Sequence, residues 1–204
     1  AIAIKGNFDD AQTEVKKIFN DDSFKNRLNA NGYQFSSANS MNIGRLVPQI
    51  SYYLYTYGQL VRRQEIKLGD EVNFAVPTGN FGDILAGYYA KKLGLPIKKL
   101  ICASNENNVL TDFFNNGVYD KRRKFHLTNA PAMDILVSSN LERLLFDLYD
   151  ENNYEVASLM NQLTQRGHYQ VSGEVFTKLQ KNFAAGFATE EEVKSEIKRV
   201  YNYD

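Results

Sequence analysis

Hydrophobic and polar positions along this chain repeat with two different periods. Residues 72–76 and 97–103 are short apolar runs that contain β-branched side chains, the pattern of buried strands. Between them, residues 84–93 repeat apolar positions at helical spacing, and Gly94 and Pro96 follow as stop signals. A strand, a helix and a second strand within about 30 residues predict a βαβ crossover with parallel strands.

The same reading extends over the rest of the chain. Further strands are expected at residues 1–5 and 33–36. Amphipathic spacing predicts helices at residues 11–20, 42–63, 110–114, 139–148, 154–165, 172–182 and 190–203. Ser139, followed three residues later by Glu142, predicts a capping box, and Thr189 is the expected N-cap of the last helix.

Strands alternate with helices up to about residue 135, whereas helical patterns dominate afterwards. This order predicts an α/β fold over residues 1–135, with three αβα layers around a mostly parallel sheet that forms a cofactor-binding core. Residues 136–204 are expected to form a mainly helical or α+β portion that leads toward a second lobe.

The composition is that of an ordinary globular protein and argues against several kinds of partner. Lys plus Arg and Asp plus Glu number 24 each among 204 residues, so the net charge of zero gives no attraction to nucleic acid or to an anionic membrane. No apolar run approaches the roughly 20 residues of a membrane-spanning helix. The single cysteine, Cys102, fits a reducing cytoplasm. His126 and His168 stand apart, so no metal site is predicted.

The loop after the first strand of the crossover has the features of an anion site. Gly79 and Gly82 allow a sharp turn without a Cβ in the way, and the loop opens a helix whose first N–H groups and dipole favour a negative charge. It lacks the lysine of a nucleotide-binding P-loop and the glycine spacing of a dinucleotide fingerprint. One phosphate monoester held by backbone N–H groups therefore fits best. The Asp83 carboxylate would repel it if it pointed inward, so Asp83 is expected to cap the helix or to face elsewhere.

A near-copy of this loop at residues 6–10 serves as an internal comparison. It also lies between a predicted strand and a predicted helix, but Asp9 replaces the second glycine and Asp10 follows. Two adjacent carboxylates would repel an anion, so this copy is interpreted as a structural turn. An ordinary tight turn remains the alternative interpretation of the second copy as well.

Residues 76–92 resemble the cofactor phosphate loop and following helix of threonine synthases, which are pyridoxal-phosphate enzymes with a tryptophan-synthase-like fold. Four other stretches agree with that family in order and approximate spacing: residues 6–10, 37–42, 133–135 and 138–143. The resemblance implies pyridoxal 5'-phosphate as cofactor and the conversion of O-phospho-L-homoserine and water to L-threonine and phosphate in the cytoplasm. The residues it places around the cofactor phosphate are Gly79, Asn80, Phe81, Gly82 and Asp83.

The polar stretch at residues 37–42 directly precedes a long predicted helix and is the candidate for substrate contact. The residues concerned are Ser37, Asn39, Ser40 and Asn42. An N-cap supplied by Ser40 or Asn42 explains the same residue types and stays open as the alternative.

The family's Schiff-base lysine belongs to a Phe-Lys-Asp motif, which these 204 residues do not contain. The resemblance therefore implies an internal fragment that carries the phosphate loop without a catalytic lysine, is inactive alone, and leaves cofactor retention and oligomeric state open. Two alternatives remain: another pyridoxal-phosphate lyase of this fold, such as a threonine or serine dehydratase, and a non-enzymatic α/β module that binds a phosphorylated ligand.

Overall fold

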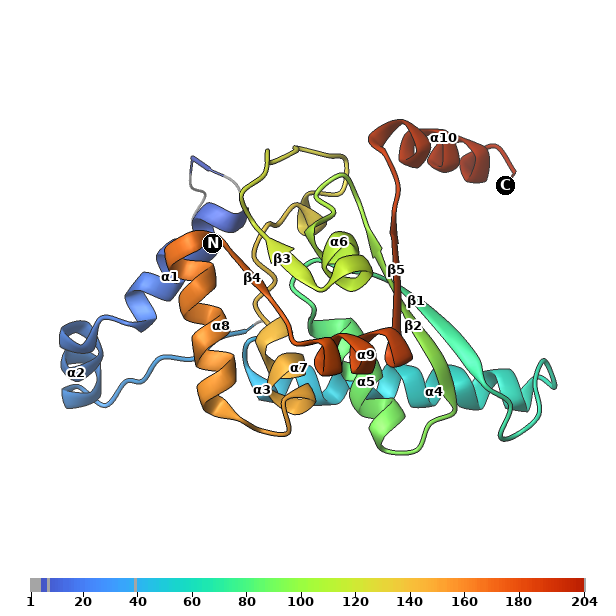
Figure 1. Cartoon of the computed structure of the whole chain (residues 1–204), viewed down its shortest axis with the longest axis horizontal. Coiled ribbons are helices and arrows are strands. Elements are labelled where there is room, and N and C mark those ends of the chain that lie inside the picture. The colour runs from blue at the N-terminus through green and yellow to red at the C-terminus, as the bar shows by residue number, and fades with distance from the viewer. Residues whose placement is uncertain (1–4, 7, 39, 204) are drawn as a thin grey trace.

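A parallel three-stranded sheet lies at the centre of the computed structural model, which describes residues 5–6, 8–38 and 40–203 (Figure 1). Its strands are β1 (Val72–Pro77), β2 (Ile97–Ser104) and β5 (Phe183–Phe187), in the order β1-β2-β5. β2 is the middle strand and pairs in parallel with both neighbours. Helix α5 (Gly82–Lys92) connects β1 to β2, which confirms the predicted βαβ crossover.

Helices and a second, two-stranded sheet surround this sheet. The helices before it are α1 (Phe8–Phe19), α2 (Asp22–Ala30), α3 (Ile43–Leu46), the 3-10 turn η1 (Val47–Gln49) and α4 (Ile50–Arg62). Those after it are α6 (Val109–Asn116), η2 (Pro131–Met133), α7 (Leu141–Leu148), α8 (Asn153–Arg166), α9 (Gly173–Asn182) and α10 (Glu190–Tyr201). β3 (Val118–Asp120) and β4 (His168–Gln170) pair as a separate two-stranded antiparallel sheet. The α/β class with a parallel sheet is thus confirmed.

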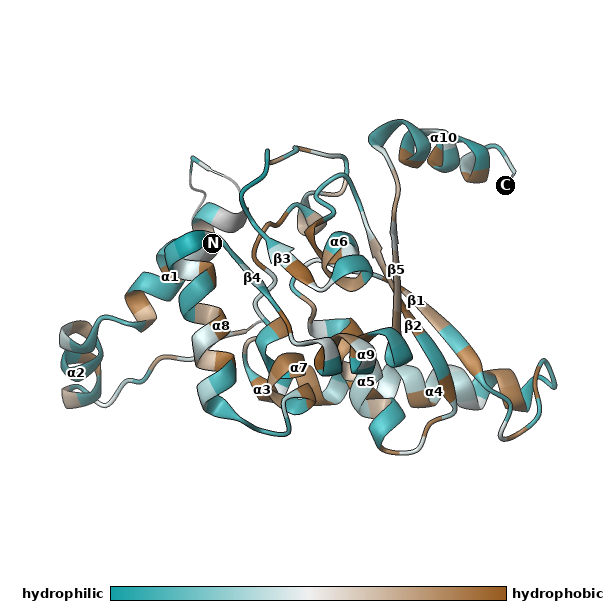
Figure 2. Ribbon diagram, viewed as in Figure 1, coloured by the Kyte–Doolittle hydropathy of each residue, from teal (hydrophilic) through white to brown (hydrophobic). Residues whose placement is uncertain are grey.

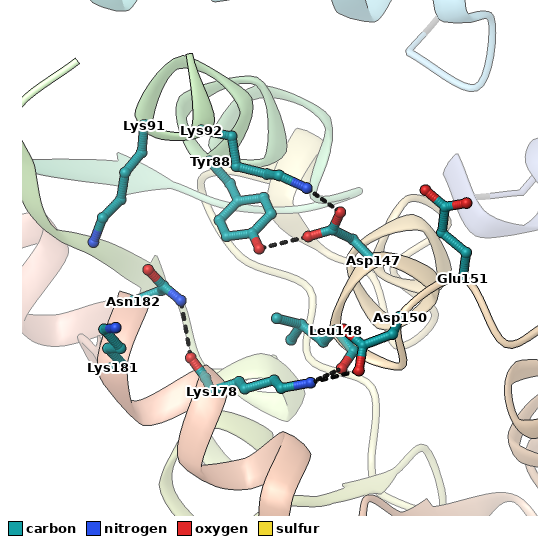
Figure 3. Close-up of a pocket in the computed structure, with 10 residues that line it drawn as sticks. All are labelled: Tyr88, Lys91, Lys92, Asp147, Leu148, Asp150, Glu151, Lys178, Lys181 and Asn182. Carbon is teal, nitrogen blue, oxygen red and sulfur yellow. Dashed lines mark hydrogen bonds and ion pairs between the residues drawn. The ribbon is translucent and has the colours of Figure 1, made fainter. Parts of the chain in front are cut away.

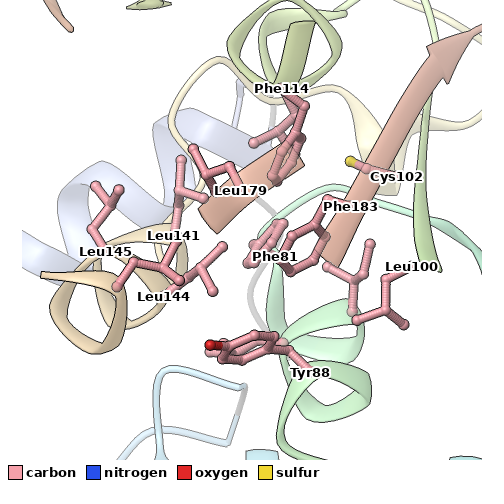
Figure 4. Close-up of a cluster of buried hydrophobic side chains, with 14 of the residues drawn as sticks. Phe81, Tyr88, Leu100, Cys102, Phe114, Leu141, Leu144, Leu145, Leu179 and Phe183 are labelled. Carbon is pink, nitrogen blue, oxygen red and sulfur yellow. The ribbon is translucent and has the colours of Figure 1, made fainter. Parts of the chain in front are cut away.

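The core forms where α5, α6 and α9 contact the sheet. Leu100 and Cys102 on the middle strand are fully buried. Nearby, the Phe114 ring stacks on both Phe81 and Phe183, and the three ring centroids lie 4.9 to 5.9 Å apart (Figure 4). Cys102 is a core residue, and its burial raises the pKa of the thiol to about 12.

The long helical pattern at residues 42–63 is confirmed with one change of geometry. Pro48 lies in the 3-10 turn η1, where its missing N–H costs little, and α4 continues from Ile50. Figure 2 shows hydrophobic and hydrophilic positions mixed along the outlying helices, and α10 has no buried residue. Within the described part of the chain, no helix is long and apolar enough to cross a membrane.

One predicted strand is wrong, and two elements were not predicted. Residues 33–36 form no strand, because Phe35 packs on Phe19 and Phe24 instead of beside another strand, and Tyr33 is 69% exposed. The polar residues before them form α2, which was not predicted. β5 was also missed, because its alanines and glycine give no strand signal.

Two further predictions concern helix and strand starts. The prediction of a capping box at residues 139–142 is wrong, because α7 begins after Asn140, whose side chain makes no capping hydrogen bond. The predicted N-cap Thr189 is confirmed, and it forms a capping box with Glu192 at the start of α10. The strand predicted at residues 1–5 lies almost entirely outside the described residues, and α1 already begins within the predicted turn at residues 6–10.

Gly87 lets α4 pack tightly against α5, which gives a direct test of this packing. A Cβ on Gly87 would lie 2.7 Å from the buried Tyr53 ring and 2.9 Å from Leu100. We expect Gly87→Ala to lower the free energy of unfolding, because overpacking of about 1–3 kcal/mol outweighs the ~1 kcal/mol that alanine gains in helix propensity.

Gly58 on α4 is the matched control, because it is exposed and has nothing within 4 Å of an added Cβ. Gly58→Ala should raise the free energy of unfolding by up to ~1 kcal/mol in the same denaturation experiment. Equal stabilisation by both substitutions would contradict the packing of α4 on α5.

Candidate functional site

The loop at residues 78–81 ends β1 and presents free backbone N–H groups at the N-terminus of α5. Phe81 adopts a left-handed conformation (φ 66°, ψ 10°) directly before helical Gly82, and its side chain makes no capping hydrogen bond. Thr78 N–H donates to Ala103 O (2.8 Å) and Gly82 N–H to Asn80 Oδ1 (3.0 Å). No acceptor among the described residues receives the N–H groups of Gly79, Asn80 or Phe81. A left-handed residue followed by a helical one forms a nest that favours an anion.

Both glycines of the loop are required by protein segments that pack against them. A Cβ on Gly79 would lie 2.9 Å from Ala132 O in η2, and a Cβ on Gly82 would lie 2.3 Å from Ser40 Oγ. From the sequence, the two glycines are expected to make room for a ligand. The structure gives a further reason, because other parts of the chain occupy the space that their side chains would need.

Segments that are distant in sequence meet at this loop. Ser138 Oγ donates to Gly79 O (2.7 Å), and both the backbone N–H and the side-chain Nδ2 of Asn140 donate to Asn80 O (3.0 Å each). Asn140 Nδ2 also donates to Ser40 Oγ (3.0 Å). Residues 37–42 and 138–143, which the sequence resemblance singled out, therefore lie against the loop.

A buried polar network extends the same edge of the sheet beyond β2. The Asp134 carboxylate accepts hydrogen bonds from Asn105 Nδ2 (2.7 Å), Asn107 Nδ2 (3.0 Å) and both the N–H and the hydroxyl of Thr128. These hydrogen bonds hold Asp134 in place, and with it the preceding η2 turn that covers Gly79. Sequence reasoning missed both asparagines, although two asparagines directly after a parallel strand are a usable signal, since this edge is where such sheets bind ligands.

The predicted substrate-contact residues have different surroundings. Asn42 caps α3, since its Oδ1 accepts from Gly44 N–H (2.9 Å) while its Nδ2 donates to Ser37 O (2.9 Å). Ser40 is 7% exposed and lies against Gly82. Asn39 is outside the described residues. Contact with substrate stays a prediction for all four residues.

Two cavities lie near α5, one at each end. One of about 560 Å³ adjoins residues 138–143 and is also lined by Lys16 of α1 and by Asn20, directly after that helix. The other, of about 660 Å³, lies at the C-terminal end of α5, where Lys92 pairs with Asp147 (Figure 3). Four lysines and three carboxylates line that second cavity, so their charges largely offset one another, and the negative end of the α5 dipole disfavours an anion there. The N-terminal loop, with free N–H groups at the positive end of the dipole, is the better anion site.

Asp83 turns its carboxyl away from the free N–H groups and toward α4. Tyr53 OH donates to Asp83 O (2.9 Å) and lies 3.3 Å from Asp83 Oδ1. Burial of the carboxyl raises the pKa of Asp83 above its usual 3.8, and the hydrogen bond from Tyr53 offsets part of this rise. The side chain therefore points away from the loop, as the sequence led us to expect.

Comparison with protein-family models gave no match. A protein named threonine synthase-like 1 from Homo sapiens is 45% identical over 204 residues, covering 99% of this chain and 28% of the relative. Threonine synthase from Saccharomyces cerevisiae is 39% identical over 209 residues, covering 98% of this chain and 39% of the relative. The crystal structure of pyridoxal-phosphate-bound threonine synthase from Brucella melitensis matches with a TM-score of 0.83 at 40% identity, covering 99% of this chain and 41% of that one.

The chain is homologous to threonine synthase over nearly its whole length. It spans well under half of each of these relatives, 28% of the human protein and 39% of the yeast enzyme. The resemblance noted in the sequence is thereby confirmed, and two of the stretches that carried it, at residues 37–42 and 138–143, contribute residues that lie against the loop.

The loop of this threonine synthase homologue suits the phosphate group of a pyridoxal-phosphate cofactor. Three consecutive N–H groups are free, the carbonyls of the same stretch are held by Ser138 and Asn140, and the neighbouring carboxyl of Asp83 faces Tyr53. The loop itself contains neither Lys nor Arg. Gly79, Asn80 and Phe81 would hold a phosphate through backbone N–H groups at the positive end of the α5 dipole.

Two carboxyls give opposite pH dependences of stability, which tests the placement of Asp83. Because the pKa of Asp83 is raised in the folded protein, the folded state holds the proton more tightly than the unfolded state. Wild type therefore loses stability as the pH rises from 3.8 through the pKa of the folded state. The free energy of unfolding of Asp83→Asn should therefore increase relative to that of wild type as the pH rises through this range. The gain should be modest, since the residue keeps contact with solvent.

Asp120 serves as the control of opposite sign. The hydrogen bond from the Arg122 guanidinium holds the pKa of Asp120 well below its usual value, so wild type gains stability as pH rises through that lower range up to 3.8. Asp120→Asn should lose stability relative to wild type over that rise. Chemical denaturation from pH 2 to pH 7 measures both trends, and equal trends for the two variants would contradict the assigned environments.

Proposed function

We propose that this chain supplies the phosphate-binding part of a pyridoxal-phosphate-dependent threonine synthase, which converts O-phospho-L-homoserine and water to L-threonine and phosphate. The observation that carries the proposal is the row of free N–H groups at Gly79, Asn80 and Phe81, in a chain homologous to a threonine synthase solved with pyridoxal phosphate bound. A phosphate monoester matches three backbone donors and a helix dipole without a lysine or a metal ion.

The residues of this chain have a binding and positioning part in the proposed reaction. Pyridoxal phosphate, when bound, supplies an electron sink for the carbanions formed at Cα and Cβ of the substrate. The loop fixes the phosphate end of the ring, so that the ring takes one position relative to the substrate. The family's Schiff-base lysine belongs to a Phe-Lys-Asp motif that these residues do not contain, so proton transfer by a lysine is not assigned to this chain.

Substrate contact is proposed for the segment at residues 37–42. Ser40 lies directly against Gly82, which brings this segment next to the cofactor phosphate. The Asn42 side chain already bonds Gly44 and Ser37, so its contribution is to fix the segment rather than to bind substrate directly. A cytoplasmic location is part of the same proposal, because a single buried cysteine fits a reducing compartment.

Phosphate recognition is tested by comparing two ligands that differ only in the phosphate. In the protein expressed from its complete gene, we expect pyridoxal phosphate to bind at least tenfold more tightly than pyridoxal, because each hydrogen bond to a charged group contributes about 1.5–3 kcal/mol. Gly82→Ala should reduce this ratio, since its Cβ would collide with Ser40 and displace the loop.

Gly173→Ala is the matched control, because nothing lies within 4 Å of a Cβ there and it sits at the N-terminus of α9, away from the loop. Absorption titration measures the affinity for both ligands. Equal affinities of wild type for pyridoxal phosphate and pyridoxal would contradict the proposal.

The reaction itself separates the proposed function from its two alternatives. A threonine synthase releases phosphate and L-threonine in equal amounts from O-phospho-L-homoserine. A threonine or serine dehydratase would instead release ammonia and a 2-oxo acid from threonine or serine, and a non-enzymatic module would bind phosphate esters without turnover. Product analysis by mass spectrometry distinguishes the three, and either of the last two outcomes would overturn the assignment.

A further inference from the structure

We infer that Ser138 and Asn140 are positioning residues that aim the N–H groups of the phosphate loop at its ligand. This inference rests on the proposed function and deepens it. Neither residue needs to touch the ligand, because both act on the opposite face of the loop, through the carbonyl oxygens of Gly79 and Asn80.

Peptide planarity links those carbonyls to the donors of the site. The C=O of one residue and the N–H of the next belong to one rigid unit and point in opposite directions. Holding Gly79 O therefore sets the direction of Asn80 N–H, and holding Asn80 O sets the direction of Phe81 N–H. Both N–H groups are free among the described residues, and both carbonyls are bound by residues 138–140.

The bonds from Asn140 fix Asn80 O firmly. Its backbone N–H and its side-chain Nδ2 each donate to this oxygen at 3.0 Å, and the residue is 0% exposed. Arg143 Nη1 donates to Asn140 Oδ1 (3.0 Å), which sets the amide so that Nδ2 faces the loop. The Arg143 guanidinium also binds the carbonyls of Ser40 and Met41.

The position of Asn140 in its own helix argues against a purely local role. Asparagine before the first turn of a helix normally accepts a hydrogen bond from that turn, which stabilises the helix by about 1 kcal/mol. The Asn140 side chain occupies this place in front of α7 but makes no capping bond, and its donors reach residues 60 and 100 positions away. The Asn140 side chain therefore holds the loop and Ser40 and does not cap α7.

The test measures how strongly each variant prefers pyridoxal phosphate to pyridoxal, in the protein expressed from its complete gene. Asn140→Asp keeps the shape but replaces the Nδ2 donor by an oxygen that repels Asn80 O. We expect the ratio of the two affinities to fall about tenfold, which corresponds to ~1.4 kcal/mol. Ser138→Ala removes one donor with little change in volume and should lower the ratio several-fold, so the inference stays testable if Asn140→Asp fails to fold.

Asn182→Asp is the matched control. Its Nδ2 also donates to a backbone carbonyl, Lys178 O (3.0 Å), but at the far cavity shown in Figure 3. This variant should keep the wild-type ratio. A general loss of stability lowers the affinity for both ligands alike, so it leaves the ratio unchanged.

The outcomes distinguish this inference from the function on which it rests. A lower ratio in Asn140→Asp or Ser138→Ala, with Asn182→Asp unchanged, supports the inference. A wild-type preference for pyridoxal phosphate that persists in both variants overturns it and leaves the proposed function standing. A wild type without any preference overturns the proposed function, and the inference with it.

Discussion

Burial of the Phe81 side chain is the interaction on which the loop depends. Phe81 is 1% exposed, stacks on Phe114 of α6 and contacts the tilted ring of Phe183 of β5, although its backbone is in the left-handed region. That conformation costs a non-glycine residue roughly 1–2 kcal/mol. Burying a phenylalanine side chain contributes about 1.5–3 kcal/mol, which outweighs this cost. The core therefore holds the backbone in the conformation that leaves the N–H groups free.

One side of the loop backbone contacts the protein, and the other side presents donors to a ligand. The Gly79 and Asn80 carbonyls and the glycine Cα atoms face protein, namely η2, Ser40 and residues 138–140, while the N–H groups of Asn80 and Phe81 point away from the residues that bind those carbonyls. Binding through backbone donors suits one phosphate monoester, because three N–H groups and a helix dipole match its oxygens without a side-chain cation. Lys91 and Lys92 lie at the opposite end of α5, where they complement the helix C-terminus.

The sequence allowed the crossover and its loop to be predicted because their signals are local. The apolar runs of β1 and β2, the spacing of α5 and the two glycines all lie within about 30 residues. The Asn80–Asn140 contact could not be derived this way, since it joins residues 60 positions apart and the pattern around Asn140 favoured a capping box one residue earlier. β5 escaped prediction because its small residues become a strand only beside β2. Family resemblance, rather than periodicity, indicated which distant stretches belong together.

Amide spectra of the labelled protein test the central claim most directly, namely that free backbone N–H groups of the loop bind the phosphate of pyridoxal phosphate. We predict that pyridoxal phosphate shifts the ¹H–¹⁵N resonances of Gly79, Asn80 and Phe81 more than those of the residues in α5, and that pyridoxal leaves them in place. Saturation with pyridoxal phosphate that leaves these three resonances unmoved, and shifts those of Lys91 and Lys92 instead, would contradict the account.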